Sequence, residues 1–137
     1  QGYHYRSDFV DIDRYNNFMT NIFEVLSSFP FPTYFKLHPG VNHYPDFLSS
    51  ETIILKPSLP SQFVINSYSI VISFTSGSIC NAPNALSLIS LVHLVPYSNS
   101  EIYSRSLTVI ECKQQSEIYL PESVDLFIAH LHQLLAF

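Results

Sequence analysis

The chain has 137 residues, of which 47% are hydrophobic and only 12% are charged, and its formal net charge is -5. A chain of this length can bury the core of one ordinary domain without disulfide bonds. The negative charge and the lack of any basic run argue against a nucleic-acid groove. No apolar run approaches the roughly 18 residues that cross a bilayer. The sequence therefore predicts one soluble domain over residues 1–137, without a transmembrane segment and without nucleic acid as a partner.

The first residue is Gln rather than Met, so we expect the sequence to be an excerpt of a longer protein. The low charge content suggests that some surface is normally buried against another domain or partner. Cys80 and Cys112 are far apart and lack the C-x-x-C spacing of a redox or metal motif. We expect reduced thiols and a cytoplasmic location, with the inner face of the membrane as one option.

The first predicted element is an amphipathic helix over residues 13–28. Apolar residues recur at helical spacing from Tyr15 to Leu26, behind an Asp-rich start that supplies caps and favourable charge. Pro30 and Pro32 end this helix, because proline lacks the N–H group that the helical ladder needs.

Short strands and loops are predicted next. A β-type run over residues 33–37 is closed by His38 and Pro39. Residues 41–50 are polar and interrupted by proline, which predicts a loop over the surface. A second short strand is predicted over residues 52–55, and two turns of helix over residues 62–67.

The sequence "SIVISF" at residues 69–74 is a β-branched run typical of a central strand buried on both faces. It leads into "TSGS" and then into a short helix that Pro83 shortens or kinks. The run "LISLVHLV" at residues 88–95 predicts another buried strand.

Residues 96–120 are rich in Tyr and Ser and stay unassigned, with an edge strand over residues 107–111 as one option. Pro121 is then expected in the first turn of a C-terminal helix. The apolar stripe of that helix is formed by Val124, Phe127, Ile128, Leu131, Leu134 and Leu135.

Strands that alternate with helices predict a mostly parallel sheet with helices on both faces and crossovers of the usual hand. The expected fold is therefore a Rossmann-like three-layer α/β domain.

Two motifs could carry chemistry, and the first is the pair Lys36 and His38. Residues two apart on a strand share a face, and ligands of open α/β sheets bind beyond the carboxyl ends of the strands. The alternative for this motif alone is a strand-end charge followed by a hydrogen-bonded loop histidine, and that explanation is the commoner one.

The second motif, Thr75, Ser76, Gly77 and Ser78, follows a buried strand at the entry to a predicted helix. Free N–H groups and the helix dipole attract phosphate there, the hydroxyl groups add donors, and glycine allows a close approach of the backbone. The alternative is an ordinary helix cap. Both motifs are expected at carboxyl ends of strands in one sheet, and their conjunction is more specific than either motif alone.

Several other sites are excluded or disfavoured. The chain has only three glycines, so neither a G-x-G-x-x-G turn nor a Walker A loop can be written, and a G-x-S-x-G elbow around Ser76 is missing too. His130 and His132 lie about 200° apart around a helix, cannot chelate one ion together and are expected to face solvent. His93 is interpreted as a core histidine with satisfied hydrogen bonds inside a buried strand.

The stretches "YFKLHPG" and "PSLPSQFVINSYSIVISFTSGSICNA" resemble the donor-binding half of bacterial sialyltransferases and polysialyltransferases with the GT-B fold. The resemblance covers roughly residues 1–95 in element order, and only the two motifs in it are specific. It implies that cytidine monophosphate-sialic acid is the donor, that no metal or other cofactor is needed, and that the product is a bacterial surface glycan. The substrate-binding residues would be Lys36, Pro39, Gly40, Gln62, Thr75, Ser76, Gly77 and Ser78.

The resemblance also implies individual roles. His38 would be the catalytic residue at the phosphate, neutralising charge as the phosphate leaves, and Lys36 would lie near the cytosine or its ribose. A Pro-x-Glu in the family, whose carboxylate takes the ribose hydroxyl groups, is replaced here by Pro60, Ser61 and Gln62. An amide can still form hydrogen bonds but carries no charge.

In the family, the general base and the glycan acceptor belong to the other, N-terminal half, so this chain alone should be inactive. Two alternatives remain open. One is half of a polyol-phosphate transferase of the teichoic-acid type. The other is a non-catalytic interaction module that has lost turnover.

Overall fold

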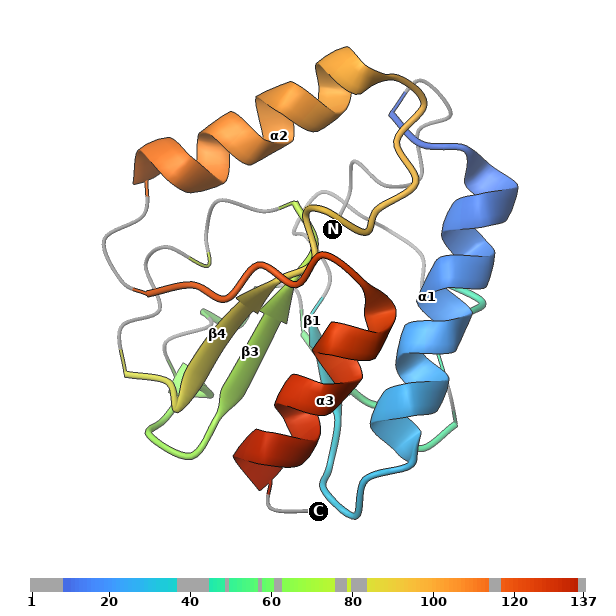
Figure 1. Cartoon of the computed structure of the whole chain (residues 1–137). Helices are drawn as coiled ribbons and strands as arrows, with labels where there is room; N and C mark the ends of the chain where they lie inside the picture. The colour runs from blue at the N-terminus through green and yellow to red at the C-terminus, as the bar shows by residue number, and fades with distance from the viewer. Residues whose placement is uncertain are drawn as a thin grey trace. The chain divides into compact units, whose positions relative to one another are not determined.

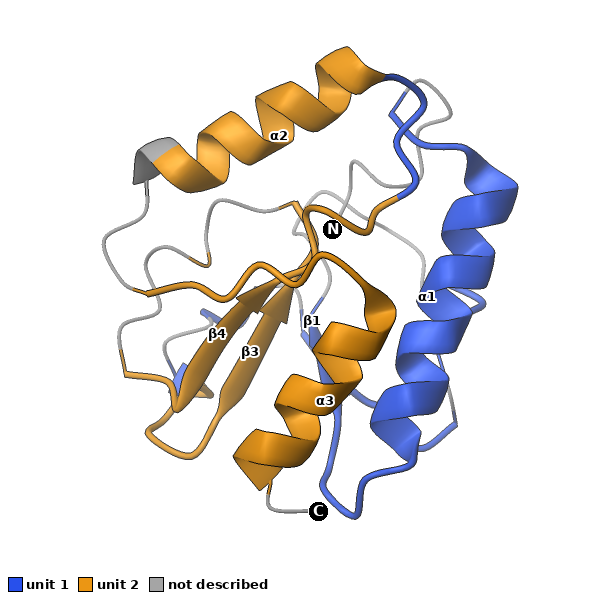
Figure 2. Ribbon diagram, in the orientation of Figure 1, with its two compact units in different colours: residues 1–63, 96–99 blue, residues 64–95, 100–137 orange. Residues whose placement is uncertain are grey.

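The structure is a computed structural model (Figure 1). It describes residues 9–36, 45–48, 50–56, 58–60, 63–75, 79, 84–113 and 117–135, except the side chains of residues 112 and 113. The chain divides into two compact units (Figure 2), which are taken one at a time. Unit 1 comprises residues 1–63 and 96–99, and unit 2 comprises residues 64–95 and 100–137.

Unit 1 begins with α1 (Ile12–Ser27), which confirms the predicted helix to within one residue at each end. The side chain of Asp11 accepts a hydrogen bond from the backbone N–H of Arg14 at 3.2 Å, which caps the first turn. At the other end the N–H of Ser28 bonds to helix carbonyl groups, and the prolines that follow prevent a further turn. The buried face is formed by Tyr15, Met19, Ile22 and Phe23.

Two short strands follow α1 and pair in parallel. They are β1 (Tyr34–Lys36) and β2 (Ile53–Leu55), with Lys36 opposite Leu55 at their carboxyl ends. The backbone N–H of Ile53 donates to the carbonyl of Thr33 at 2.9 Å and starts the ladder. Both predicted strands are confirmed, except that each begins one residue later than predicted.

The loop over residues 41–50 was predicted to lie on the surface, but two of its described residues are buried. Pro45 and Phe47 are buried, and the Phe47 ring lies 5.6 Å from that of Phe23 and 6.3 Å from that of Phe35, measured between centroids. A phenyl ring removed from water stabilises the fold by about 2 kcal/mol or more, which outweighs the polar character of its neighbours.

Unit 2 contains a second parallel pair, β3 (Ile70–Ser73) and β4 (Ser87–Ser90), whose arrowheads lie at the same end in Figure 1. Tyr119 adds a parallel bridge to Ile89, with its N–H donating to Leu88 and its carbonyl accepting from Ser90. The chain from β4 to this bridge passes through a helix, as a parallel connection requires.

The burial of the two strands differs from the expectation. β3 is half-buried over its first three residues and fully buried only at Ser73. The strand predicted over residues 88–95 ends at Ser90, because the N–H of Leu94 turns back to the carbonyl of Leu91 at 2.9 Å. Leu91 and Val92 are nevertheless fully buried, so the apolar run correctly indicated burial but not the backbone conformation.

The edge strand suggested over residues 107–111 is wrong, because these residues lie in α2 (Ser100–Lys113). Ile102 and Ile110, eight residues apart, are both buried, and Glu101 pairs with Arg105 one turn later. Residues four and eight apart lie along one side of a helix, as these pairs do in α2.

Of the helix predicted over residues 62–67, the described residues show 3₁₀ geometry at Phe63 alone, and the prediction is wrong for residues 64–67. The N–H of Phe63 bonds to the carbonyl of Pro60, and the side chain of Asn66 accepts a hydrogen bond from the N–H of Tyr68 at 2.9 Å. An asparagine side chain that bonds two residues ahead forms a turn and competes with a helix.

The C-terminal helix α3 (Val124–Leu135) is confirmed, with Phe127 and Leu131 buried. Its cap is Ser123, whose hydroxyl accepts from the N–H of Leu126 at 3.1 Å. Pro121 therefore lies before the helix rather than in its first turn. Ahead of a capping serine its fixed φ angle still directs the chain toward the helix.

The described residues thus form a small mixed α/β arrangement with three helices and two separate two-stranded parallel sheets. The predicted class and the parallel pairing are confirmed. One sheet containing all the predicted strands is not what these residues form.

Candidate functional site

The two predicted motifs both follow a parallel strand. Lys36 is the last residue of β1 and is half-buried, and Thr75, two residues beyond the end of β3, is half-buried as well. Each therefore lies at the carboxyl end of its own strand pair, as predicted. The two pairs are separate sheets in the described part of the chain, so the single sheet expected to carry both motifs is not found there.

The remaining predicted site residues lie outside the described part of the chain. They are His38, Pro39, Gly40, Gln62, Ser76, Gly77 and Ser78. Their grouping around one ligand stays a prediction.

The carboxyl edge of the β3–β4 sheet is well defined by hydrogen bonds. Ser73 lies opposite Ser90 in the ladder, and the N–H of Leu91 donates to the carbonyl of Ser73 at 2.7 Å. The buried hydroxyl of Ser90 donates to the carbonyl of Phe74 at 3.4 Å. The backbone just before Thr75 is therefore fixed to the neighbouring strand.

A histidine that sequence reasoning assigned to the core lies beyond the same edge. His93 follows the end of β4 in the turn that begins at Leu91, and it is half-buried rather than inside a strand. Its Nδ1 atom is 2.7 Å from the hydroxyl oxygen of Tyr103 in α2. The expectation that its hydrogen bonding is satisfied holds for this nitrogen, whereas its position in a buried strand does not.

The apolar run around His93 was the feature of the sequence that could have indicated a hydrogen-bonded histidine. A polar, titratable side chain in an otherwise apolar run is uncommon unless it has a partner, and a tyrosine ten residues on supplies one. What the sequence did not show is that the strand ends before His93.

The other two histidines of this unit differ from each other. His132 is exposed, as expected. His130 is half-buried and stacked on Tyr119, with ring centroids 4.1 Å apart, so the expectation that it faces solvent is wrong.

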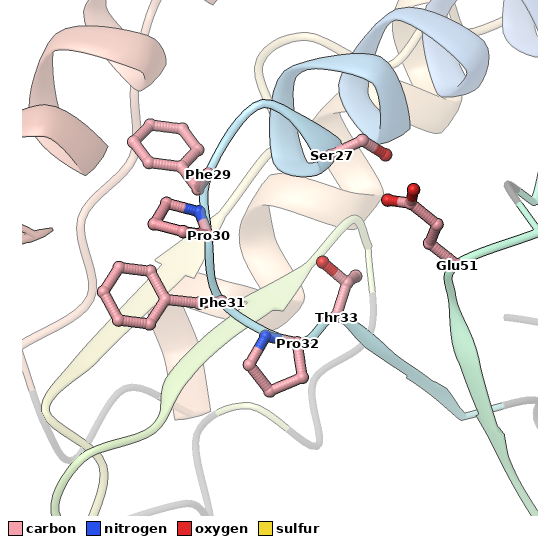
Figure 3. Close-up of a pocket in the computed structure, with 7 residues that line it drawn as sticks. All are labelled: Ser27, Phe29, Pro30, Phe31, Pro32, Thr33 and Glu51. Carbon is pink, nitrogen blue, oxygen red and sulfur yellow. The ribbon is translucent and has the colours of Figure 1, made fainter.

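A pocket of about 260 Å³ lies in unit 1 at the opposite end of the β1–β2 pair, where the strands begin. Figure 3 shows the rings of Phe29 and Phe31 on one side of the backbone and the polar ends of Ser27 and Glu51 on the other. These polar and aromatic groups do not converge on one ligand position. The pocket therefore does not coincide with the carboxyl edge at Lys36.

Across the residues that the structure describes, no three His, Cys, Asp or Glu side chains gather as a metal site would require. None of the helices in the described ranges has both the length and the apolar composition to cross a bilayer.

No protein-family pattern, curated protein or solved structure matches this chain. The motifs and the local geometry are therefore the basis for any functional proposal.

Proposed function

We propose that the chain is the nucleotide-sugar-binding domain of a GT-B glycosyltransferase, with a cytidine monophosphate-linked sugar such as sialic acid as the donor. The observation that supports the proposal is that Lys36 ends β1 and Thr75 follows β3, each at the carboxyl end of a parallel strand. Ligands of α/β folds bind at this end. The proposal includes a Rossmann-like three-layer arrangement for the whole domain.

The chemistry proposed for these residues is electrostatic. Cleavage of the sugar–phosphate bond builds negative charge on the departing phosphate, and donors already in place stabilise that charge. His38 supplies an imidazole for this purpose, and Thr75, Ser76 and Ser78 supply hydroxyl or N–H groups. Gly77 allows the backbone close to the phosphate, and Pro39 and Gly40 shape the loop behind His38.

Lys36 and Gln62 act on the nucleoside part in this proposal. Lys36 contacts the cytosine or its ribose, and the Gln62 amide bonds the ribose hydroxyl groups where the family has a carboxylate. A neutral amide forms weaker bonds than a carboxylate, so we expect weaker donor binding than in a typical member. Transfer would in addition need the general base and the glycan acceptor, which the family's other half supplies.

Calorimetric titration with cytidine monophosphate tests the proposal directly. We expect saturable binding at or below about 1 mM, which corresponds to only about 4 kcal/mol of binding free energy. Cytidine, which lacks the phosphate, should bind more weakly. The His38→Ala variant should lose affinity, while the His132→Ala variant should not, because His132 is exposed on α3. The absence of binding at 1 mM would contradict the proposal.

A second titration separates the two transferase classes. A teichoic-acid type transferase takes a cytidine diphosphate-linked polyol, so cytidine diphosphate would then bind more tightly than cytidine monophosphate.

The interaction-module alternative is favoured by one observation. Tyr34, Ile53 and Ile54 of the β1–β2 pair are 57%, 44% and 42% exposed, which is high for apolar side chains on neighbouring strands. If neither cytidine nucleotide binds, and replacing all three residues with Ser breaks a self-association seen by sedimentation in the wild-type chain, this alternative replaces the enzyme proposal.

A further inference from the structure

We propose that His93, positioned by Tyr103, is a further anion-binding residue at the carboxyl edge of the β3–β4 sheet, where it contacts the phosphate of a ligand bound next to Thr75. The identity of that ligand as a cytidine nucleotide rests on the proposed function. The binding of a phosphate group by His93 does not depend on the nucleoside.

The first support is position. The bond between the N–H of Leu91 and the carbonyl of Ser73, at 2.7 Å, joins the two chains as they leave the sheet. Thr75 is two residues beyond Ser73, and His93 is two residues beyond Leu91. Two residues span at most about 7 Å of chain, so both side chains start close to the same bonded pair.

The second support is the way this edge is held. The buried hydroxyl of Ser90 donates to the carbonyl of Phe74, which fixes the backbone directly before Thr75. The Leu91–Leu94 hydrogen bond closes the turn that carries His93. Both residues therefore extend from backbone that the sheet makes rigid, as a preorganised site requires.

The third support is the state of the imidazole ring. Tyr103 engages Nδ1 at 2.7 Å, and the imidazole ring has a second nitrogen, Nε2, that can form a hydrogen bond of its own. Nε2 is therefore the ring nitrogen that a ligand would contact, and the bond to Tyr103 in α2 sets the direction in which it points. The residues around His93 differ from it: Leu91 and Val92 are fully buried, whereas His93 keeps part of its surface exposed.

Nuclear magnetic resonance of the imidazole nitrogens in the ¹⁵N-labelled wild-type chain tests this without altering the protein. In a phosphate-free buffer, separate titrations use cytidine monophosphate, inorganic phosphate and cytidine. We expect the His93 signals, assigned from their loss in His93→Gln, to shift saturably with the first two ligands and not with cytidine. The exposed His132 serves as the internal control and should not shift.

The outcomes separate this inference from the proposed function. If cytidine monophosphate binds and the His93 signals stay unchanged, the inference is wrong and the proposed function stands. If phosphate shifts the His93 signals and cytidine monophosphate shows no binding beyond that of phosphate, the anion site stands and the proposed function fails. If neither ligand has any effect, both are wrong.

Variants give the second measurement. His93→Ala should weaken the binding of cytidine monophosphate about tenfold or more, because one hydrogen bond to a charged group is lost. Tyr103→Phe should weaken it less and should change the His93 nitrogen shifts, because Nδ1 loses its hydrogen-bond partner. Unchanged His93 nitrogen shifts together with unchanged affinity in Tyr103→Phe would overturn the positioning role. His132→Ala is the control that should behave like the wild type.

Discussion

At the scale of single residues, Phe47 is the centre of an aromatic cluster in unit 1. This cluster consists of Tyr15, Phe23, Phe35 and Phe47, and the ring of Phe47 lies 5.6 to 6.3 Å from each of the others. Two of the contacts are edge-to-face, the geometry that the charge distribution of aromatic rings favours. A residue from a connecting segment thereby joins α1 to β1.

We expect Phe47→Ala to lower the free energy of unfolding by about 3 to 5 kcal/mol, because it removes a buried ring and leaves a cavity. Urea unfolding followed by circular dichroism measures this. Phe63→Ala removes the same atoms from a side chain that is 72% exposed and should cost less than about 0.5 kcal/mol. Equal losses in the two variants would show that Phe47 is not part of the core.

His130 gives a second test at this scale. Its ring stacks on Tyr119, and its Nε2 atom is buried without a hydrogen-bond partner in the described part of the chain. We expect His130→Phe to keep the stack, remove the buried polar atom and leave stability unchanged or raised by about 1 kcal/mol. His130→Ala, which loses the stack, should be destabilising, and thermal unfolding of both variants would reveal the reverse order if the nitrogen has a partner.

At the scale of elements, local signals at the ends of helices were more reliable than signals for strand length. Asp11 and the prolines after Ser28 define α1 as the sequence indicated. The strands proved short, three or four residues each, because a strand ends where its partner ends. The residue types inside a strand do not indicate where it will end.

Replacing the capping residue of α1 tests whether this local hydrogen bond stabilises the helix. Asp11→Ala should lower the free energy of unfolding by about 1 kcal/mol, since the N–H of Arg14 loses its acceptor. Asp11→Asn retains an acceptor oxygen and should recover most of the loss. Chemical denaturation of the three proteins measures both effects, and equal destabilisation by Ala and Asn would show that the charge of Asp11, rather than its hydrogen bond, stabilises α1.

At the scale of the whole molecule, the proposal requires both motifs to contact one ligand. The His38→Ala and Ser76→Ala variants should each lower the affinity for cytidine monophosphate about tenfold, because each removes a donor to a charged phosphate. If the two groups contact the same phosphate, their effects on the binding free energy should depend on each other.

A double-mutant cycle measured by calorimetry provides the readout. Ser58→Ala, at an exposed described position, is the matched control for the loss of a hydroxyl group. Two losses that add without coupling, or only one loss, would mean that the motifs do not meet at one phosphate.

The sequence by itself determined the α/β class, α1, α3 and the approximate positions of the strands. Helical periodicity, capping residues and β-branched runs are local properties, and each can be recognised within one segment. It also indicated correctly that Lys36 and Thr75 end or follow strands, because proline and glycine interrupt the pattern there.

The tertiary structure alone decided the rest. β4 ends opposite Ser73, the last residue of its partner β3, where the N–H of Leu94 turns back to the carbonyl of Leu91. The helical state of residues 107–111 goes together with the burial of Ile102 and Ile110. The burial of Phe47 depends on rings contributed by α1 and β1. These choices are made by partners distant in the sequence, whose contacts exist only once the chain has folded, and for the same reason the contact between His93 and Tyr103 could not be recognised before.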